Sequence, residues 1–313
     1  LEEKVVGTYV LRRLLQMIPV FILATLLLYA MVYGLPGDAA AAMCGDRGCD
    51  PAFVAKFNEE HHLDEPLLVQ YGYYLQGVLT LDFGETFTGR PVLEVMKETF
   101  PVTIKLAMIA WLLEVLIGLP IGLIAGLKRG TFLDTAALLL TLLVISVPVF
   151  VLGFLAQFYL GLRWGVFDPT VGGDASWSAL LLPGLVLAAM SVAYITRLMR
   201  TSIVENKSAD YVKTALAKGL PKHRIIGVHL LRNSLIPVVT FLGTDLGALM
   251  GGAIVTEGIF NVPGVGNQIY RAIGAVENAT VVSFVTVLIF VYLVANLIVD
   301  LLYAVLDPRI RLD

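Results

Sequence analysis

Six long apolar runs limit what this chain can fold into. A helix needs about 20 mainly apolar residues to cross a bilayer, and six runs of about that length or longer, each bounded by charge, occur at 14–37, 106–127, 135–162, 175–196, 233–256 and 278–299. Four of them lack Asp, Glu, Lys and Arg, whereas the second contains Glu114 and the fifth contains Asp245. We therefore expect an all-α polytopic membrane protein with six transmembrane helices.

The composition agrees with that class. Apolar residues make up 58% of the 313 positions and charged residues 15%, against about half and about a quarter in soluble domains. The first run is too long for a signal-peptide core and has no clear cleavage site directly after it, so we interpret it as a retained anchor. A net charge of −3 gives no indication of nucleic-acid binding.

The basic residues predict the orientation, because Lys and Arg concentrate in cytoplasmic loops. Most lie near the two ends and in the loops after the second and fourth runs, including residues 197–232. We expect both termini in the cytoplasm of a bacterial or archaeal cell. The predicted segments are a cytoplasmic start with the first span (1–37), an extracytoplasmic region (38–100), a core with spans two to six (101–306) and a cytoplasmic tail (307–313).

The extracytoplasmic region has local order of its own. Asp50 and Pro51 are typical of a helix cap and first turn, and a second helix is predicted from Pro66 through Tyr74. Acidic residues outnumber basic ones here, which is typical of a solvated surface and also suits docking of an external partner. Cys44 and Cys49 bracket a Gly-Asp-Arg-Gly turn. An oxidising exterior favours a disulfide, worth roughly 2 kcal/mol for so short a loop; a pair of free thiols is the alternative.

The fourth and fifth runs are separated by a polar, basic stretch, which we call the elbow segment (residues 208–233). Ser208 is placed to cap a first short helix, and Gly219 can adopt the left-handed conformation that ends it. Pro221 suits the first turn of a second helix, with Ile225, Ile226 and Leu230 on its apolar face. The sequence predicts a helix, a glycine turn and a helix, with the shape of a docking surface.

Glycine spacing indicates close helix packing. Residues four apart form stripes in run two (Gly118, Gly122, Gly126) and in run five (Gly243, Gly247, Gly251), and small residues let membrane helices approach closely. Glu114 and Asp245 belong to these two helices. A charge in mid-membrane must face protein or water, so these carboxyls either line a polar pathway or hydrogen-bond between helices.

After the fifth run, proline and glycine break the helix on the predicted outer side. The stretch predicts a re-entrant or gate-lining loop, because irregular backbone at that depth needs protein or water beside it. The residues we assign to an outer gate loop are Glu257, Phe260, Pro263, Gly264 and Gly266.

The sequence offers no catalytic set. It lacks a phosphate-binding loop, a His-Glu-x-x-His helix and a Gly-x-Ser-x-Gly elbow, and its Cys and His residues do not show metal-ligand spacing. We expect no enzyme activity, metal site or cofactor on this chain.

Several long strings, in order, resemble the permease subunits of binding-protein-dependent ABC importers, in the dipeptide, oligopeptide and nickel branch. They are RRLLQMIPV with LPGD, LDEPLLVQYGYYLQGVLTLDFGETF, DYVKTALAKGL with HLLRNSLIPVVT, and GGAIVTEGIFNVPGVG with the closing DPR. The resemblance covers nearly the whole chain. Lys213 and Thr214 depart from the wider superfamily's Glu-Ala, and VENAT (276–280) replaces a stretch that contains Asp-Pro.

The resemblance implies a type I importer permease fold with an outward helical insertion between the first two spans. It also implies a second, related permease chain, two ATPase subunits that bind ATP and Mg, and an extracytoplasmic binding protein. The elbow segment is then the coupling loop that fits an ATPase cleft. Its implied contact residues are Tyr211, Ala215, Lys218, Gly219, Leu220 and His223.

Two other classes stay open from the residues alone. A secondary transporter driven by an ion gradient often has inverted repeats, and we find no clear symmetry between residues 1–150 and 151–313. A membrane scaffold without transport is the other. Co-purification of an ATPase favours the importer, and ionophore-sensitive uptake without ATP favours the secondary transporter.

Overall fold

The computed structural model describes residues 2–34, 44 and 48–306 of the chain, and in these residues it is helical, with one isolated β-bridge between Glu85 and Pro91. The LPGD string at 35–38 and the predicted tail at 307–313 lie outside the described residues. The chain divides into two compact units, which we treat separately. Unit 1 is Leu1–Thr103 with Pro263–Asp313, and unit 2 is Ile104–Val262.

Among the described residues, four helices are long and apolar enough to cross a membrane: Val10–Tyr33, Val92–Leu127, Leu181–Lys207 and Asn278–Val299. In the same residues, two bent helix pairs bring the number of candidate spans to as many as six, if each pair is one span. In the first pair the backbone of Val147 is extended directly before Pro148, and the chain bends by 102° between the two helices. The expected third span (135–162) is therefore a bent pair of helices, because proline disfavours helical backbone in the residue before it.

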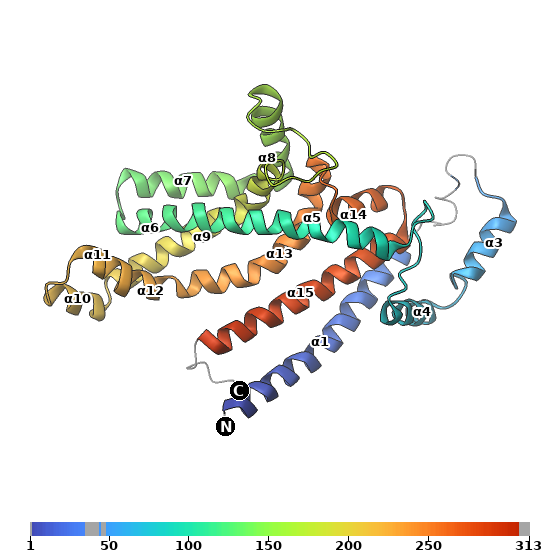
Figure 1. Cartoon of the computed structure of the whole chain (residues 1–313), viewed down its shortest axis with the longest axis horizontal. Helices are drawn as coiled ribbons and strands as arrows, with labels where there is room; N and C mark the ends of the chain where they lie inside the picture. Colours follow the sequence, from blue (N-terminus) through green and yellow to red (C-terminus); the bar gives the residue numbers. More distant parts are fainter. Residues whose placement is uncertain (1, 35–43, 45–47, 307–313) are drawn as a thin grey trace. The chain divides into compact units, whose positions relative to one another are not determined.

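Unit 1 is built on two long helices that lie side by side, α1 (Glu2–Tyr33) and α15 (Asn278–Leu306) (Figure 1). The unit also holds α3 (Pro51–Glu60), α4 (Leu67–Thr80), the first half of α5 (Val92–Leu113) and α14 (Val265–Gly274). The predicted second outward helix is therefore longer than expected, since the helix continues past Tyr74 to Thr80.

A cluster of four tyrosines fastens α4 to the long helices; it consists of Tyr29, Tyr33, Tyr71 and Tyr74. The Tyr74 hydroxyl donates to Thr286 Oγ1 of α15 at 2.6 Å, and the Tyr71 and Thr25 hydroxyls lie 2.9 Å apart. Burial raises the pKa of Tyr74, so its hydroxyl keeps the proton that it donates.

The segment after α4 is bound to the start of α15. The Phe87 N–H donates to Glu277 Oε1 at 2.8 Å, and the Thr280 hydroxyl donates to the same oxygen at 2.7 Å. Both acceptor and hydroxyl belong to the VENAT stretch. This stretch, which departs from the resembled family, thus joins two parts of unit 1.

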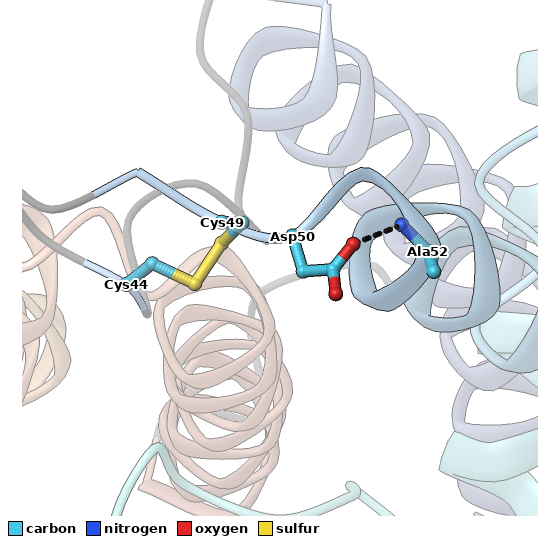
Figure 2. Close-up of a disulfide and its surroundings, with 4 residues drawn as sticks. All are labelled: Cys44, Cys49, Asp50 and Ala52. Atoms are coloured by element: carbon cyan, nitrogen blue, oxygen red, sulfur yellow. Dashed lines mark hydrogen bonds between the residues drawn. A yellow bond between two sulfur atoms is a disulfide. The ribbon is translucent and has the colours of Figure 1, made fainter.

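The predicted cap of α3 is confirmed, as is the disulfide beside it. Asp50 Oδ1 accepts a hydrogen bond from the Ala52 N–H at 3.0 Å, with Pro51 as the first helical residue. Cys44 and Cys49 are joined directly before this cap, as Figure 2 shows.

In unit 2 the central helix is α9 (Leu181–Lys207), which packs against most of the others. The second span enters this unit in α5 and continues through the π-helical η2 (Glu114–Gly118) and α6 (Leu119–Leu127). Its α5 starts at Val92, well before residue 106. The early turns were missed because they carry charged residues on their exposed side, while Val92, Val95 and Met96 are buried.

The remaining helices of unit 2 follow in order. The bent third span is α7 (Phe132–Ser146), α8 (Val149–Ala156) and the π-helical η3 (Gln157–Arg163). After α9 come α10 (Asp210–Ala217), α11 (Lys222–Arg224), η4 (Ile225–Leu230) and α12 (Leu231–Ser234), and the fifth span is α13 (Ile236–Phe260). Figure 1 shows α6 and α7 running beside each other, in contact with α9.

The glycine stripe of the second span is confirmed as a packing surface. A Cβ built on Gly122 would lie 2.6 Å from the Thr196 carbonyl oxygen of α9, and one on Gly126 would lie 2.7 Å from Ile203. The stripe of the fifth span is different. Gly251 is exposed, with nothing within 4 Å of such a Cβ, so close packing is not found at this residue, whereas Gly247 of the same stripe is buried.

Candidate functional site

The elbow segment folds as two helical stretches around a glycine turn, as its sequence predicts. α10 ends before Gly219, whose φ of +73° is the left-handed conformation that favours glycine. Pro221 directly precedes the second stretch, which runs from Lys222 to Ser234. The turn therefore depends on a residue without a side chain.

Ser208 does not cap the first of these helices. Its hydroxyl donates to the Glu205 carbonyl oxygen at 2.9 Å, and the residue before α10 is Ala209. The capping prediction was wrong because α9 extends to Lys207 and uses Ser208 at its own end.

The underside of the elbow segment is apolar and buried. Val212, Ala215, Ile225 and Leu230 belong to one cluster with Met199 and Ile203 of α9, and none of the four is more than 5% exposed. The predicted apolar residues of the second stretch thus meet the core of unit 2. This apolar contact attaches the elbow segment to α9.

The predicted contact residues fall on two sides. Tyr211, Lys218, Gly219 and His223 are exposed, whereas Ala215 is buried and Leu220 packs against the cluster. The exposed residues are free to meet a partner. The two inward residues hold the segment on unit 2.

The exposed side is braced by polar contacts. The Tyr211 hydroxyl donates to Asn206 Oδ1 at 2.5 Å, and Lys213 Nζ lies 2.9 Å from Asp210 Oδ1. Lys207 Nζ donates to the Leu127 carbonyl oxygen at 3.1 Å, which ties the end of α9 to the end of α6. Lys218, Lys222 and Arg224 stay exposed, so the surface is basic.

The structure brings Glu114 and Asp245 together. They come from η2 and α13, they interact electrostatically, and Ser191 of α9 lies beside both. Glu114 is fully buried and Asp245 is partly exposed. Ser191 was not singled out in the sequence. A serine in an apolar run is a weak signal, because such residues often hydrogen-bond their own helix backbone.

The predicted gate residues lie on either side of a confirmed helix break. In unit 2, Glu257 and Phe260 are fully buried, and α13 ends at Phe260 with Asn261 as its cap; the Val262 N–H donates to the Glu257 carbonyl oxygen at 3.0 Å. In unit 1, Gly264 and Gly266 are buried and Pro263 partly so. The stretch that follows is largely helical, since α14 starts at Val265.

Residues 164–180 connect three helices of unit 2; the last six of them were expected to begin the fourth span, but α9 starts only at Leu181. Lys105 Nζ donates to the Ala175 carbonyl oxygen at 2.6 Å and lies 4.7 Å from the Trp177 ring centroid. Gln157 Nε2 donates to the Pro169 and Ile259 carbonyl oxygens at 2.9 and 3.1 Å. The sequence feature that could have indicated this connection is Gln157, a single amide side chain within an apolar run.

Comparison with known proteins agrees with this architecture. Residues 118–312 match the model of the binding-protein-dependent transport system inner membrane component, and residues 7–107 match the model of the N-terminal part of such components. A dipeptide transport system permease protein of Escherichia coli K12 is 36% identical over 333 residues, covering 97% of this chain and 98% of that protein.

Other relatives are similar over the same extent. A putative peptide transport system permease protein of Brucella abortus (strain 2308) is 34% identical over 311 residues, covering 97% of this chain and 99% of that protein. A dipeptide transport system permease protein of Alkalihalophilus pseudofirmus is 33% identical over 330 residues, with 97% and 99% covered.

A bundle of long apolar helices with a basic elbow defines a multi-pass permease of the inner membrane. The chain belongs to the family of binding-protein-dependent transport system inner membrane components, which are the permease subunits of ABC importers. Members of this family are generally non-catalytic membrane components, and the fold is consistent with that of type I importer permeases.

Proposed function

We propose that this chain forms part of the translocation pathway for di- or oligopeptides in an ATP-driven importer, and that the elbow segment couples it to ATPase subunits. The substrate class follows the names of the relatives, which are dipeptide and peptide transport system permeases. The elbow segment supports the coupling, because its underside is buried against α9 while its basic turn is exposed.

The mechanical argument starts at Gly219. Two short helices with a buried underside can move as one body with α9, so a push on the exposed turn reaches the membrane helices. A chain without a phosphate-binding loop needs such a push from outside. We propose that two ATP-binding subunits, which carry ATP and Mg, supply it on the cytoplasmic side, where both termini also lie.

The other proposed partners are a second, related permease chain and an extracytoplasmic binding protein. Residues 38–100, with α3 and α4, and the gate residues around the end of α13 would face the binding protein. Glu114 and Asp245 would line the pathway. Asp245→Asn is expected to lower peptide uptake, and unchanged uptake in this variant together with poor expression of Asp245→Leu would assign Asp245 to packing alone.

The test of coupling is Gly219→Val in the reconstituted importer. A side chain in the left-handed conformation costs about 1–2 kcal/mol, roughly tenfold in population, so the turn should change shape. We expect peptide uptake to fall by about tenfold, while the ATPase loses its stimulation by loaded binding protein.

Gly130→Val is the matched control. Gly130 has a φ of +81° and nothing within 4 Å of a built Cβ, and it lies in the loop between α6 and α7. The backbone strain is therefore the same but outside the elbow segment. Normal stimulated turnover in Gly219→Val, or equal loss in Gly130→Val, would remove the coupling role.

A further inference from the structure

Three helices of unit 2 enclose a small polar site within the apolar bundle. Glu114 is the first residue of η2, Ser191 lies on α9 and Asp245 lies on α13. By distance and angle, Glu114 Oε1, Glu114 Oε2 and Asp245 Oδ2 are buried and have no hydrogen-bond partner within the described chain. The Glu114 side chain is fully buried, so these oxygens are shielded from water, and the Ser191 hydroxyl beside them is a side-chain donor that acts on both carboxyls.

The helices are held in register next to this site. The Trp111 indole N–H donates to the Leu242 carbonyl oxygen at 2.9 Å. Trp111 precedes Glu114 by three residues, and Leu242 precedes Asp245 by three residues. Residues three apart share a helix face, so this bond sets the two carboxyl-bearing faces against each other. The π-helical turns that begin at Glu114 are also a feature found often at functional sites.

Such a site is costly without a cation. A buried polar group without a partner destabilises the fold by about 1–3 kcal/mol, and two adjacent carboxylates repel each other. Within the described chain, the groups that act on these two carboxyls are each other and Ser191, none of which is basic. A proton or a bound cation must therefore compensate the charge.

We propose that Glu114, Asp245 and Ser191 form a binding subsite for a primary ammonium group of a passing peptide. An ammonium group has three N–H donors, which matches the three buried oxygens that have no hydrogen-bond partner by distance and angle within the described chain. Asp245 is partly exposed and forms the entrance, and Glu114 lies beneath it. The described residues contain no group of three His, Cys, Asp or Glu side chains suited to a metal ion.

This subsite rests on the proposed peptide transport and deepens it. Every unblocked peptide carries one α-ammonium group, and lysine side chains carry the same chemistry. A negatively charged point inside an apolar pathway would favour peptides over neutral solutes of the same size, because an ammonium group in a low-dielectric site interacts strongly with carboxylates.

The test uses the complete importer in lipid nanodiscs, without binding protein or ATP. The thermal unfolding midpoint is measured in methylammonium chloride and in tetramethylammonium chloride at equal concentration. The two cations carry the same charge, but only methylammonium has N–H donors. A ligand that binds the folded state raises its stability, so we expect a higher midpoint in methylammonium.

The variants are Glu114→Gln and Asp245→Asn, with Glu94→Gln as the control. Glu94 lies on α5, the helix that leads into η2, and is exposed. We expect the methylammonium shift to persist in Glu94→Gln and to be lost in the two others. Should Glu114→Gln fail to assemble, Asp245→Asn at the entrance decides the result.

Three outcomes overturn the proposal. A shift that persists in Asp245→Asn places the ammonium elsewhere. No shift in the native importer means that a proton alone compensates the pair, and an equal shift in sodium or potassium chloride means an alkali-cation site. This readout needs no transport, so absence of peptide uptake in the native importer would reject the proposed function and leave the ammonium result intact.

A second arm identifies the source of the ammonium group. Dialanine carries only the α-ammonium group, and Nα-acetyl-lysine carries only the side-chain one. A midpoint shift with dialanine alone assigns the subsite to the peptide N-terminus, and a shift with Nα-acetyl-lysine alone assigns it to lysine. Shifts with both would show a site for any primary ammonium group, and shifts with neither would overturn the assignment to peptides.

Discussion

The two units hold their membrane helices together by different means. In unit 1, hydroxyl and aromatic side chains from distant parts of the chain meet, as when Tyr74 reaches Thr286. In unit 2, bare glycines let the second span press directly against α9. Because lipid is as apolar as leucine, helices in a membrane associate through close packing or polar contacts rather than through the hydrophobic effect. Unit 2 adds this glycine packing to polar contacts such as that of the Trp111 indole with the Leu242 carbonyl oxygen.

The difference has a mechanical consequence. A glycine contact leaves no space for adjustment, since the backbone of one helix touches the other. A hydroxyl contact at a side-chain tip tolerates small shifts. We therefore expect unit 2, which carries the elbow segment, to be the stiffer of the two.

The largest expected effect is that of Gly122→Val. The new side chain would start 2.6 Å from the Thr196 carbonyl oxygen and 2.7 Å from Met199 Cβ, so the two helices must separate. Overpacking costs about 1–3 kcal/mol and occasionally more, and we expect the upper end here because the contact is with backbone. We expect little monodisperse protein after purification and a much lower thermal midpoint.

Gly72→Val is the matched control in unit 1. Gly72 lies in α4 and is exposed, with nothing within 4 Å of a built Cβ. Its midpoint should stay near that of the native chain. A similar loss in both variants would mean that the glycine contact is not what distinguishes unit 2.

An intermediate effect is expected for Asp134→Asn. Arg200 contacts both Asp134 oxygens, with Nη2 to Oδ2 at 2.9 Å, and the Asp134 side chain is 4% exposed. Removing a charged partner from such a hydrogen bond costs about 1.5–3 kcal/mol. The thermal midpoint of the purified chain should fall clearly.

The control for that ion pair is Glu98→Gln. Arg90 and Glu98 lie 2.7 Å apart in unit 1, but both side chains are about half exposed. Exposed pairs contribute about 0–1 kcal/mol, so the midpoint should barely move. If Glu98→Gln lowered it as much as Asp134→Asn, burial would not explain the strength of the pair in unit 2.

The smallest expected effect is that of Tyr74→Phe. The variant loses the hydroxyl that donates to Thr286, and a hydrogen bond of this kind contributes about 1 kcal/mol. Its neighbour Tyr73 is the control, because it is exposed and stacks on His62. A slight drop in midpoint with retained peptide uptake is expected for Tyr74→Phe and no drop for Tyr73→Phe. A large drop in the midpoint of Tyr74→Phe would mean that the tyrosine cluster contributes as much stability as the glycine contacts do.

Local features were largely predictable from the residues. The cap at Asp50, the left-handed turn at Gly219 and the helix break near Pro263 each depend on the chemistry of a few neighbouring residues. Predictions failed where a helix extends beyond its own apolar run. Ser208 serves the end of α9 rather than α10, and α5 begins early because its first turns bury one face.

By itself, the sequence determined that this chain is a helical membrane protein with a basic elbow, because apolar run length and charge placement are properties of single segments. Only the tertiary structure decided which polar groups meet. Glu114, Ser191 and Asp245 are far apart in the chain and become one site only when η2, α9 and α13 pack. The periodicity of one helix does not specify which residue of another helix it will face.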